Sequence, residues 1–170
     1  MSLQDEIHIL KAKAAAERGR VAQSQGEQEA AAYFYAHSLE WADTPEARVG
    51  KAQGLSYEGK LDQAIDECKK AIALDATQGQ AYNDIGVYLM QQDQDDEAMD
   101  WLSLAVSAEH LDNRHFPHYN LGRIYERKRL LHQAAASYQA ALDEKADFDS
   151  AQSALLRVKA KLQRPVGNEP

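Results

Sequence analysis

Histidine side chains concentrate in one short stretch of the chain, EHLDNRHFPHYNLG at residues 109–122. It contains His110, His115 and His118, with Asp112 among them. Imidazole and carboxylate groups bind zinc and nickel, which need three or four ligands converging on one point. Spacing alone does not bring these groups together, so His110, Asp112 and His115 are weak candidates for a metal site. The alternative is an irregular corner that a larger pattern imposes on the chain.

Other patterns with known chemistry are missing from the sequence. It has no glycine-rich phosphate loop, no His-Glu-x-x-His zinc motif and no nucleophile elbow. The single cysteine, Cys68, falls on the inward side of a predicted helix, where a thiol acts as a small hydrophobic group. The acidic run DQDDE at 93–97 lacks the spacing and the glycine of an EF-hand loop. We therefore predict no catalytic residues, no enzymatic activity and no cofactor.

The composition excludes some classes of partner. The 170-residue chain has a formal net charge of −8, whereas nucleic-acid-binding proteins usually present a basic face. The N-terminal segment MSLQDEIHILKAKAAAERGR has no apolar run that would serve as a membrane span or as the core of a signal peptide. We expect no nucleic-acid partner, no membrane insertion and a cytoplasmic location, with a leader removed ahead of this start left open as the alternative.

An internal repeat provides the elements that must position any site. Three segments align, at residues 54–76, 88–110 and 124–146. Ala64 and Ala98 are 34 positions apart, and Ala134 follows after 36. The two additional residues fall in the histidine-rich stretch. That stretch is therefore the lengthened connection between two repeats.

Each repeat is predicted to form two helices that pack through small side chains. The first helix carries a small residue at a position of close approach, namely Ala52, Gly86 or Gly122. The second begins with Ala64, Ala98 or Ala134 and places a larger residue four positions later, namely Cys68, Leu102 or Tyr138. Spacings of three and four put such residues on one helical stripe. Because no segment alternates with period two, the predicted fold class is all-α.

These repeats resemble the tetratricopeptide repeat (TPR) family, and bacterial members in particular. The residues that match the family signature are Tyr82, Ile85, Gly86, Leu89, Leu121, Gly122 and Tyr125 in first helices, and Ala98, Leu102, Ala134 and Tyr138 in second helices. The earlier repeat departs from the signature at Arg48, Lys51 and Ala52. The resemblance implies an α–α superhelix, or solenoid, of about four helix-turn-helix repeats with a C-terminal capping helix.

We expect a single solenoid domain over residues 1–164 and a flexible tail at 165–170. The expected units are repeats at 12–44, 45–78, 79–112 and 115–146, followed by a capping helix at 147–163. The first repeat is the weakest match, with Gly19 at its position of close approach. Ahead of it, Leu3, Ile7, Leu10 and Ala14 form a separate apolar stripe.

In this family the first helices line a concave groove that binds partners. Counting along those helices gives the candidate groove residues Gln53, Asn83, Asp84, Val87, Tyr119, Asn120, Arg123 and Arg127. Asn83 and Asn120 have amides that suit a peptide backbone, and Arg123 suits a carboxylate. The function that we predict is a protein–protein interaction adaptor that binds a peptide or protein of unknown identity.

Two further expectations follow from the resemblance. Family members that bind the acidic C-terminal tails of chaperones carry a clamp of Lys, Asn, Asn, Lys and Arg, whereas the last three repeats have Val49, Gln53, Asp84, Phe116 and Asn120 at those places. Chaperone tails are therefore disfavoured as partners. The alternative function is self-assembly, including a homodimer, through the alanine-rich helix around 12–16.

The repeat also favours one interpretation of the histidine-rich stretch. Pro117 falls in the first turn of a predicted helix, where a missing N–H costs nothing. Asp112 and Asn113 are ordinary turn residues. His118 takes the position of Tyr82 in the preceding repeat and is expected to pack against a neighbouring helix. A structural corner is therefore favoured over a metal site.

Overall fold

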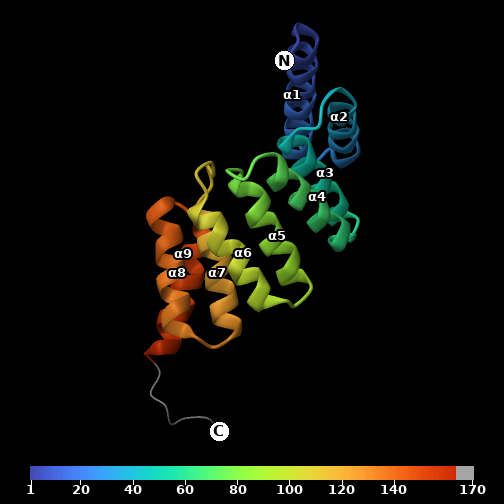
Figure 1. The fold of residues 1–170 in the computed structure, drawn as a ribbon. Coiled ribbons are helices and arrows are strands. Elements are labelled where there is room, and N and C mark those ends of the chain that lie inside the picture. The colour runs from blue at the N-terminus through green and yellow to red at the C-terminus, as the bar shows by residue number, and fades with distance from the viewer. Residues whose placement is uncertain (164–170) are drawn as a thin grey trace.

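The computed structural model describes residues 1–163 and contains nine helices in that range. Their bounds are α1 (Leu3–Ser24), α2 (Gln28–Trp41), α3 (Pro45–Tyr57), α4 (Leu61–Leu74), α5 (Gly79–Gln91), α6 (Asp95–Ser107), α7 (His115–Arg127), α8 (Leu131–Glu144) and α9 (Asp149–Leu162). Figure 1 shows them following one another in pairs along an elongated stack. The tail predicted at 165–170 lies outside the described residues. Within the described range, no helix is both long and apolar enough to cross a membrane.

The nine helices form four antiparallel hairpins and a final single helix. The hairpins are α1–α2, α3–α4, α5–α6 and α7–α8, and the second helix of each packs on the first helix of the next. The first helices also contact one another in succession, α1 with α3, α3 with α5 and α5 with α7. Such contacts place them on the inner face of the stack. The prediction of an all-α superhelix of about four repeats with a capping helix is confirmed.

Close approach within each hairpin depends on the small residues that the repeat pattern identifies. A Cβ added at Gly86 would lie 2.6 Å from Leu102 Cγ, and one at Gly122 would lie 2.6 Å from Tyr138 Cδ1. In the first half of the chain, Tyr35 takes the corresponding place and faces two glycines, Gly19 and Gly50. Larger side chains at these positions would push the paired helices apart.

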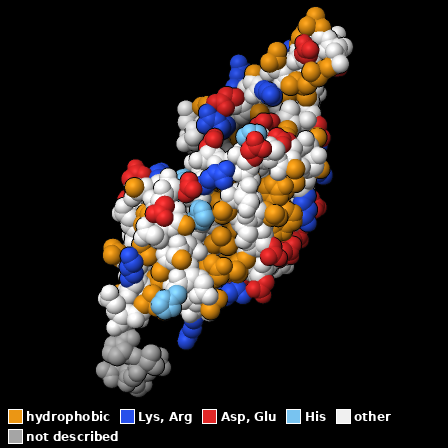
Figure 2. All heavy atoms as spheres, turned by 60° about the vertical axis from the view of Figure 1, so that its left-hand side comes forward, with side chains coloured by type: hydrophobic (Ala, Val, Ile, Leu, Met, Phe, Trp, Pro, Cys, Tyr) orange, Lys and Arg blue, Asp and Glu red, His pale blue; other side chains and the backbone are white. Residues whose placement is uncertain are grey.

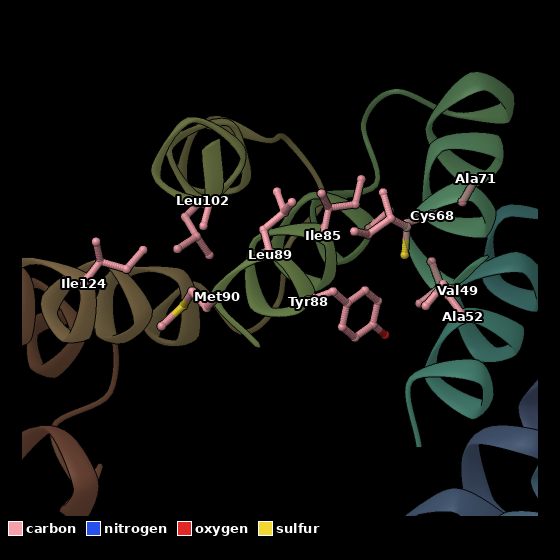
Figure 3. Close-up of a cluster of buried hydrophobic side chains, with 14 residues drawn as sticks. Val49, Ala52, Cys68, Ala71, Ile85, Tyr88, Leu89, Met90, Leu102 and Ile124 are labelled. Carbon is pink, nitrogen blue, oxygen red and sulfur yellow. The ribbon is translucent and has the colours of Figure 1, made fainter. Parts of the chain in front are cut away.

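The largest core cluster joins the middle repeats into one body. Figure 3 shows it running from Val49 and Cys68 through Ile85 to Leu102 and Ile124, so that it includes side chains of α3 to α7. A second cluster joins α8 to α9 through Tyr138, Leu155 and Val158. These contacts cover the end of the stack, as a capping helix must.

Helix α1 is longer than the other first helices. It has 22 residues, against 13 in each of α3, α5 and α7. The Ser2 hydroxyl accepts a hydrogen bond from the Asp5 amide, and the Asp5 carboxylate accepts one from the Ser2 amide, which fixes the start of the helix. The residues that it buries are small: Ala12, Ala15, Ala16, Gly19 and Ala22.

Candidate binding groove

Two cavities lie along the inner face of the stack. The first, the N-terminal cavity, has a volume of about 480 Å³ and is lined by residues of α1 and α3, by Tyr35 of α2, by Gln78 just before α5 and by Gln80 in its first turn. The second, the C-terminal cavity, has a volume of about 410 Å³ and is lined by residues of α7, α8 and α9. We refer to this inner face with its two cavities as the groove. Gln53 lines the first cavity, and Tyr119, Arg123 and Arg127 line the second.

A buried carboxylate lies between the two cavities. Asp84 on α5 is only 7% exposed. It accepts hydrogen bonds from Gln53 Nε2 at 2.9 Å, from Gln80 Nε2 at 2.6 Å and from Asn83 Nδ2 at 3.4 Å. Burial raises the pKa of Asp84 to about 6, while these three amide donors lower it and limit the rise. The carboxylate therefore ties α3 to α5 at the floor of the groove.

The same network continues to α7. Asn120 Nδ2 donates to Asn83 Oδ1 at 3.4 Å, and Arg123 Nη1 donates to Asn120 Oδ1 at 3.3 Å. We call the chain of side chains that results the polar ladder; its members are Gln53, Asp84, Asn83, Asn120 and Arg123. Both asparagines are buried, with 6% exposure each. Residues predicted to bind a peptide thus lie together on three successive first helices, α3, α5 and α7, and their side chains are hydrogen-bonded to one another.

The C-terminal cavity combines cations with two tyrosines. Glu126 accepts hydrogen bonds from Arg157 Nη2 at 2.7 Å, from Lys161 Nζ at 2.7 Å and from the Tyr138 hydroxyl at 3.1 Å. These donors, Arg157 foremost, lower the pKa of Glu126 to about 2. Glu126 is therefore ionised and holds Arg157 of the capping helix at the edge of the cavity.

The other two arginines of this cavity differ in their partners. Arg127 pairs with Asp95 and Asp93 on the neighbouring repeat and donates to the Met90 carbonyl. Arg123 is exposed, and its hydrogen bond within residues 1–163 goes to the neutral Asn120 amide. Arg123 is therefore the cation with the most capacity to bind an anion.

The N-terminal cavity has a more apolar wall. Tyr35, Val49 and Gly50 form part of it, and Lys13 lies at its edge with the ion pair of Glu17 and Arg20. Of the residues that line this cavity, Gln53 and Val49 were predicted from the sequence to face the groove. The signal that was available is Gly50, whose missing side chain leaves room for the Tyr35 ring.

Comparisons with known proteins agree with this architecture. Residues 117–148 match the family model described as tetratricopeptide repeat. The structure of Pseudomonas aeruginosa PilF superposes with a TM-score of 0.83 at 21% identity, over 91% of this chain and 70% of that one. No curated protein matches the chain in sequence.

Two further solved structures show the same fold. PilW, described as a widely conserved type IV pilus biogenesis factor, has a TM-score of 0.77 at 16% identity, over 88% of this chain and 69% of that one. YrrB, described as a TPR protein with an unusual peptide-binding site, has a TM-score of 0.64 at 19% identity, over 84% of this chain and 73% of that one. Residues 117–148 therefore match a tetratricopeptide repeat, and the described chain has the fold of TPR proteins.

The histidine-rich stretch forms the connection between α6 and α7 and continues into the first two turns of α7. The amide of His110 donates to the Thr77 carbonyl at 3.1 Å, the His110 carbonyl accepts from Gly79, and its Nδ1 lies 2.7 Å from Thr77 Oγ1. Arg114 donates to the Val106 and Ala108 carbonyls at the end of α6. These bonds hold the lengthened corner against the preceding repeat.

The three candidate metal ligands, His110, Asp112 and His115, lie in different environments. His115 is buried, and its ring lies 4.1 Å from that of Phe116 and 5.0 Å from that of Phe148. His110 is bound to Thr77, and Asp112 is exposed to solvent. Across residues 1–163, no three groups of the metal-binding types converge.

Two other residues of the helical repeats, Cys68 and Val87, pack in the core. Cys68 is fully buried, and burial raises the pKa of its thiol. Val87, predicted to face the groove, is partly buried and packs against the central core cluster. Neither side chain lines either cavity. The assignment of the remaining groove residues to ligand binding stays a prediction.

Proposed function

We propose that this protein is a TPR adaptor that binds an extended peptide segment of another protein along its groove. Proteins of this family typically mediate protein–protein interactions, and a TPR module implies a protein partner. The observation that carries the proposal is the pair of cavities on one face, with the polar ladder running from Gln53 in the first to Arg123 in the second. YrrB, a TPR protein with an unusual peptide-binding site, supports the same use of the fold.

The two cavities suit different parts of such a ligand. The C-terminal cavity holds three arginines and one glutamate, although the whole chain is acidic, with a net charge of −8. A carboxylate of the ligand, from a side chain or a chain end, would bind Arg123 there through two parallel hydrogen bonds. The N-terminal cavity, with Tyr35 and Val49 in its wall, would take an apolar side chain.

The predicted peptide-binding amides have about half of their hydrogen-bonding capacity free. The Asn83 and Asn120 oxygens already accept from Asn120 and Arg123, and one N–H of each amide already donates, so each retains one N–H and one lone pair for a peptide. We therefore assign them chiefly to holding successive repeats in register. Ligand contact falls mainly to Tyr119 and Arg123 in one cavity and to the wall of the other.

The test begins with peptides selected on the full chain from a random peptide library. Binding of a selected peptide is then measured by fluorescence anisotropy with wild type and with Arg123→Glu. We expect the substitution to weaken binding at least tenfold, because it replaces attraction by repulsion at the carboxylate site. Lys69→Glu, an exposed charge reversal of the same kind on α4, is the matched control and should leave binding unchanged. Equal binding by wild type and Arg123→Glu would contradict the proposal.

A further inference from the structure

The first half of α1 presents large apolar side chains to solvent. Leu3 is 74% exposed, Ile7 43% and Leu10 66%. The end of α2 reaches only as far as His8, whose ring lies 5.4 Å from that of Trp41. The start of α1 therefore projects beyond the stack, as Figure 1 shows, and hydrophobic side chains gather at this projecting end in Figure 2.

These side chains form a regular stripe on one side of the helix. Leu3, Ile7, Leu10 and Ala14 follow one another at intervals of four, three and four residues, which is the spacing of the contact positions in a coiled coil. The residues that α1 buries against its own chain lie on the opposite side, centred on Ala12, Ala15 and Gly19. The stripe, which we call the α1 stripe, therefore faces away from the molecule at Leu3, Ile7 and Leu10, whereas Ala14 lines a shallow pocket together with Phe34, His37 and Trp41 of α2.

We infer that the α1 stripe binds the same stripe of a second copy of this chain, in antiparallel orientation. In the register that pairs apolar residues throughout, Leu3 lies opposite Ala14 of the second copy, and Ile7 lies opposite Leu10. The two bodies then lie at opposite ends of the helix pair and do not compete for space. A two-fold symmetric contact of this kind repeats each interaction twice.

The charges beside the stripe favour this register. In an antiparallel helix pair, residues that lie beside the stripe on one helix face the residues that lie on the same side of the stripe on the other helix. Glu6 of one chain then lies beside Lys13 of the other, and the reverse pair forms by symmetry. Both side chains are exposed, and the ion pair that α1 forms within its own chain joins Glu17 to Arg20 instead. A parallel pair would bring Lys13 beside Arg18, a repulsion that offsets the attraction between Glu6 and Lys11, so it gains nothing from these charges.

The contact is small, so the dimer should be weak. Three large apolar side chains from each chain form its centre, and interfaces well below the standard size give reversible association. We expect a monomer in dilute solution and a growing fraction of dimer as the protein concentration rises. This contact brings Glu6 of the second copy to Lys13 at the edge of the N-terminal cavity, leaves the C-terminal cavity open, and does not depend on the groove's function.

The experiment measures the mass of the full chain by sedimentation equilibrium from about 5 µM to about 500 µM, a range suited to weak interfaces. Wild type should shift from the mass of one chain towards that of two. Leu10→Glu should stay monomeric over the same range with an unchanged helical circular-dichroism signal, because Leu10 packs little against its own chain. Leu156→Glu, at another exposed leucine on α9 (69% exposed), is the matched control and should dimerise as wild type does.

Charge reversal tests the orientation. Glu6→Lys and Lys13→Glu should each reduce dimerisation at least several-fold, and an equimolar mixture of the two variants should restore it. In a parallel pair, Lys13→Glu would instead strengthen association by placing a carboxylate beside Arg18.

Three results of the sedimentation experiments would overturn the inference. They are a wild-type chain that stays monomeric at the highest concentration, a dimer that Leu10→Glu leaves intact, and a strengthened dimer in Lys13→Glu. Co-flotation of a monomeric wild type, but not of Leu10→Glu, with lipid vesicles would assign the stripe to a membrane surface and would also overturn it.

Discussion

The buried carboxylate at the floor of the groove gives a prediction that depends directly on the structure. Asp84→Asn keeps the size and shape of the side chain and removes its charge. Gln53 and Gln80 both direct amides at this position, and a glutamine amide that rotates by 180° accepts a hydrogen bond where it formerly donated one. The substitution therefore preserves the contacts between α3 and α5 and should stabilise the protein at neutral pH.

The size of the effect follows from the pKa of Asp84. Burial raises it from 3.8 to about 6 in the folded protein. Because the pKa of Asp84 is higher in the folded protein than in the unfolded chain, ionisation of Asp84 favours unfolding. The contribution of this carboxyl to the free energy of unfolding is therefore fully present below the unfolded pKa and is lost as the pH rises through the folded pKa. The complete loss, reached near pH 8, is about 3 kcal/mol. At pH 5 the unfolded carboxyl is already ionised while the folded one is still protonated, and the loss is about half as large.

The assay is urea denaturation of wild type and Asp84→Asn, followed by circular dichroism at pH 5 and at pH 8. The free energy of unfolding of Asp84→Asn should exceed that of wild type at pH 8, and the difference should shrink by about 1 kcal/mol at pH 5. Asp66→Asn, at an exposed position on α4, is the control and should show no such dependence. An Asp84→Asn protein less stable than wild type at pH 8, or a difference independent of pH, would refute the reasoning.

Two further expectations concern packing and charge. Gly86→Ala should lower the free energy of unfolding by about 1 to 2 kcal/mol, because the added Cβ would meet Leu102 at 2.6 Å. Gly54→Ala, with nothing within 4 Å of the added Cβ, should raise the free energy of unfolding by about 0.5 to 1 kcal/mol. Equal effects of the two substitutions in urea denaturation would contradict this. Glu67→Gln should cost about 2 kcal/mol at pH 7, because the buried Glu67 carboxylate accepts from Arg48, at 2.7 Å, and from two lysines. These donors lower the pKa of Glu67 to about 2, against the opposing effect of burial, so the cost should diminish as the pH falls from 4.5 towards 2. A cost that is constant with pH would show that the charge is not responsible.

The fold was predictable because its decisive contacts are local. Gly86 and Leu102 lie in one hairpin, and the matching residues of the next repeat, Gly122 and Tyr138, lie in another. A repeated spacing in the sequence is enough to show that such pairs meet. The cytoplasmic location and the repeat boundaries stay predictions.

The site was harder to predict, since its contacts join different repeats. Counting along each first helix placed Asp84 and Asn83 towards the groove, but it could not show that Asp84 would be enclosed by two glutamines. Arg157 was predicted to lie on the solvent-facing side of the capping helix, and its contact with Glu126 on α7 was not predicted. Hydrogen bonds between elements far apart in the sequence leave no periodic signal.

The polar ladder determines how this groove can recognise a ligand. A peptide that used Asn83 and Asn120 as its main partners would have to break the bonds that align three first helices, and a buried amide that loses its partner is costly. A ligand that leaves the ladder intact can instead bind at its two ends, where the cavities lie. Arg123 belongs both to the polar ladder, since it donates to Asn120, and to the lining of the C-terminal cavity. A carboxylate that draws Arg123 away from Asn120 would free that amide oxygen for a peptide N–H. Under the proposed function, anion binding and backbone recognition would therefore be coupled through a single side chain.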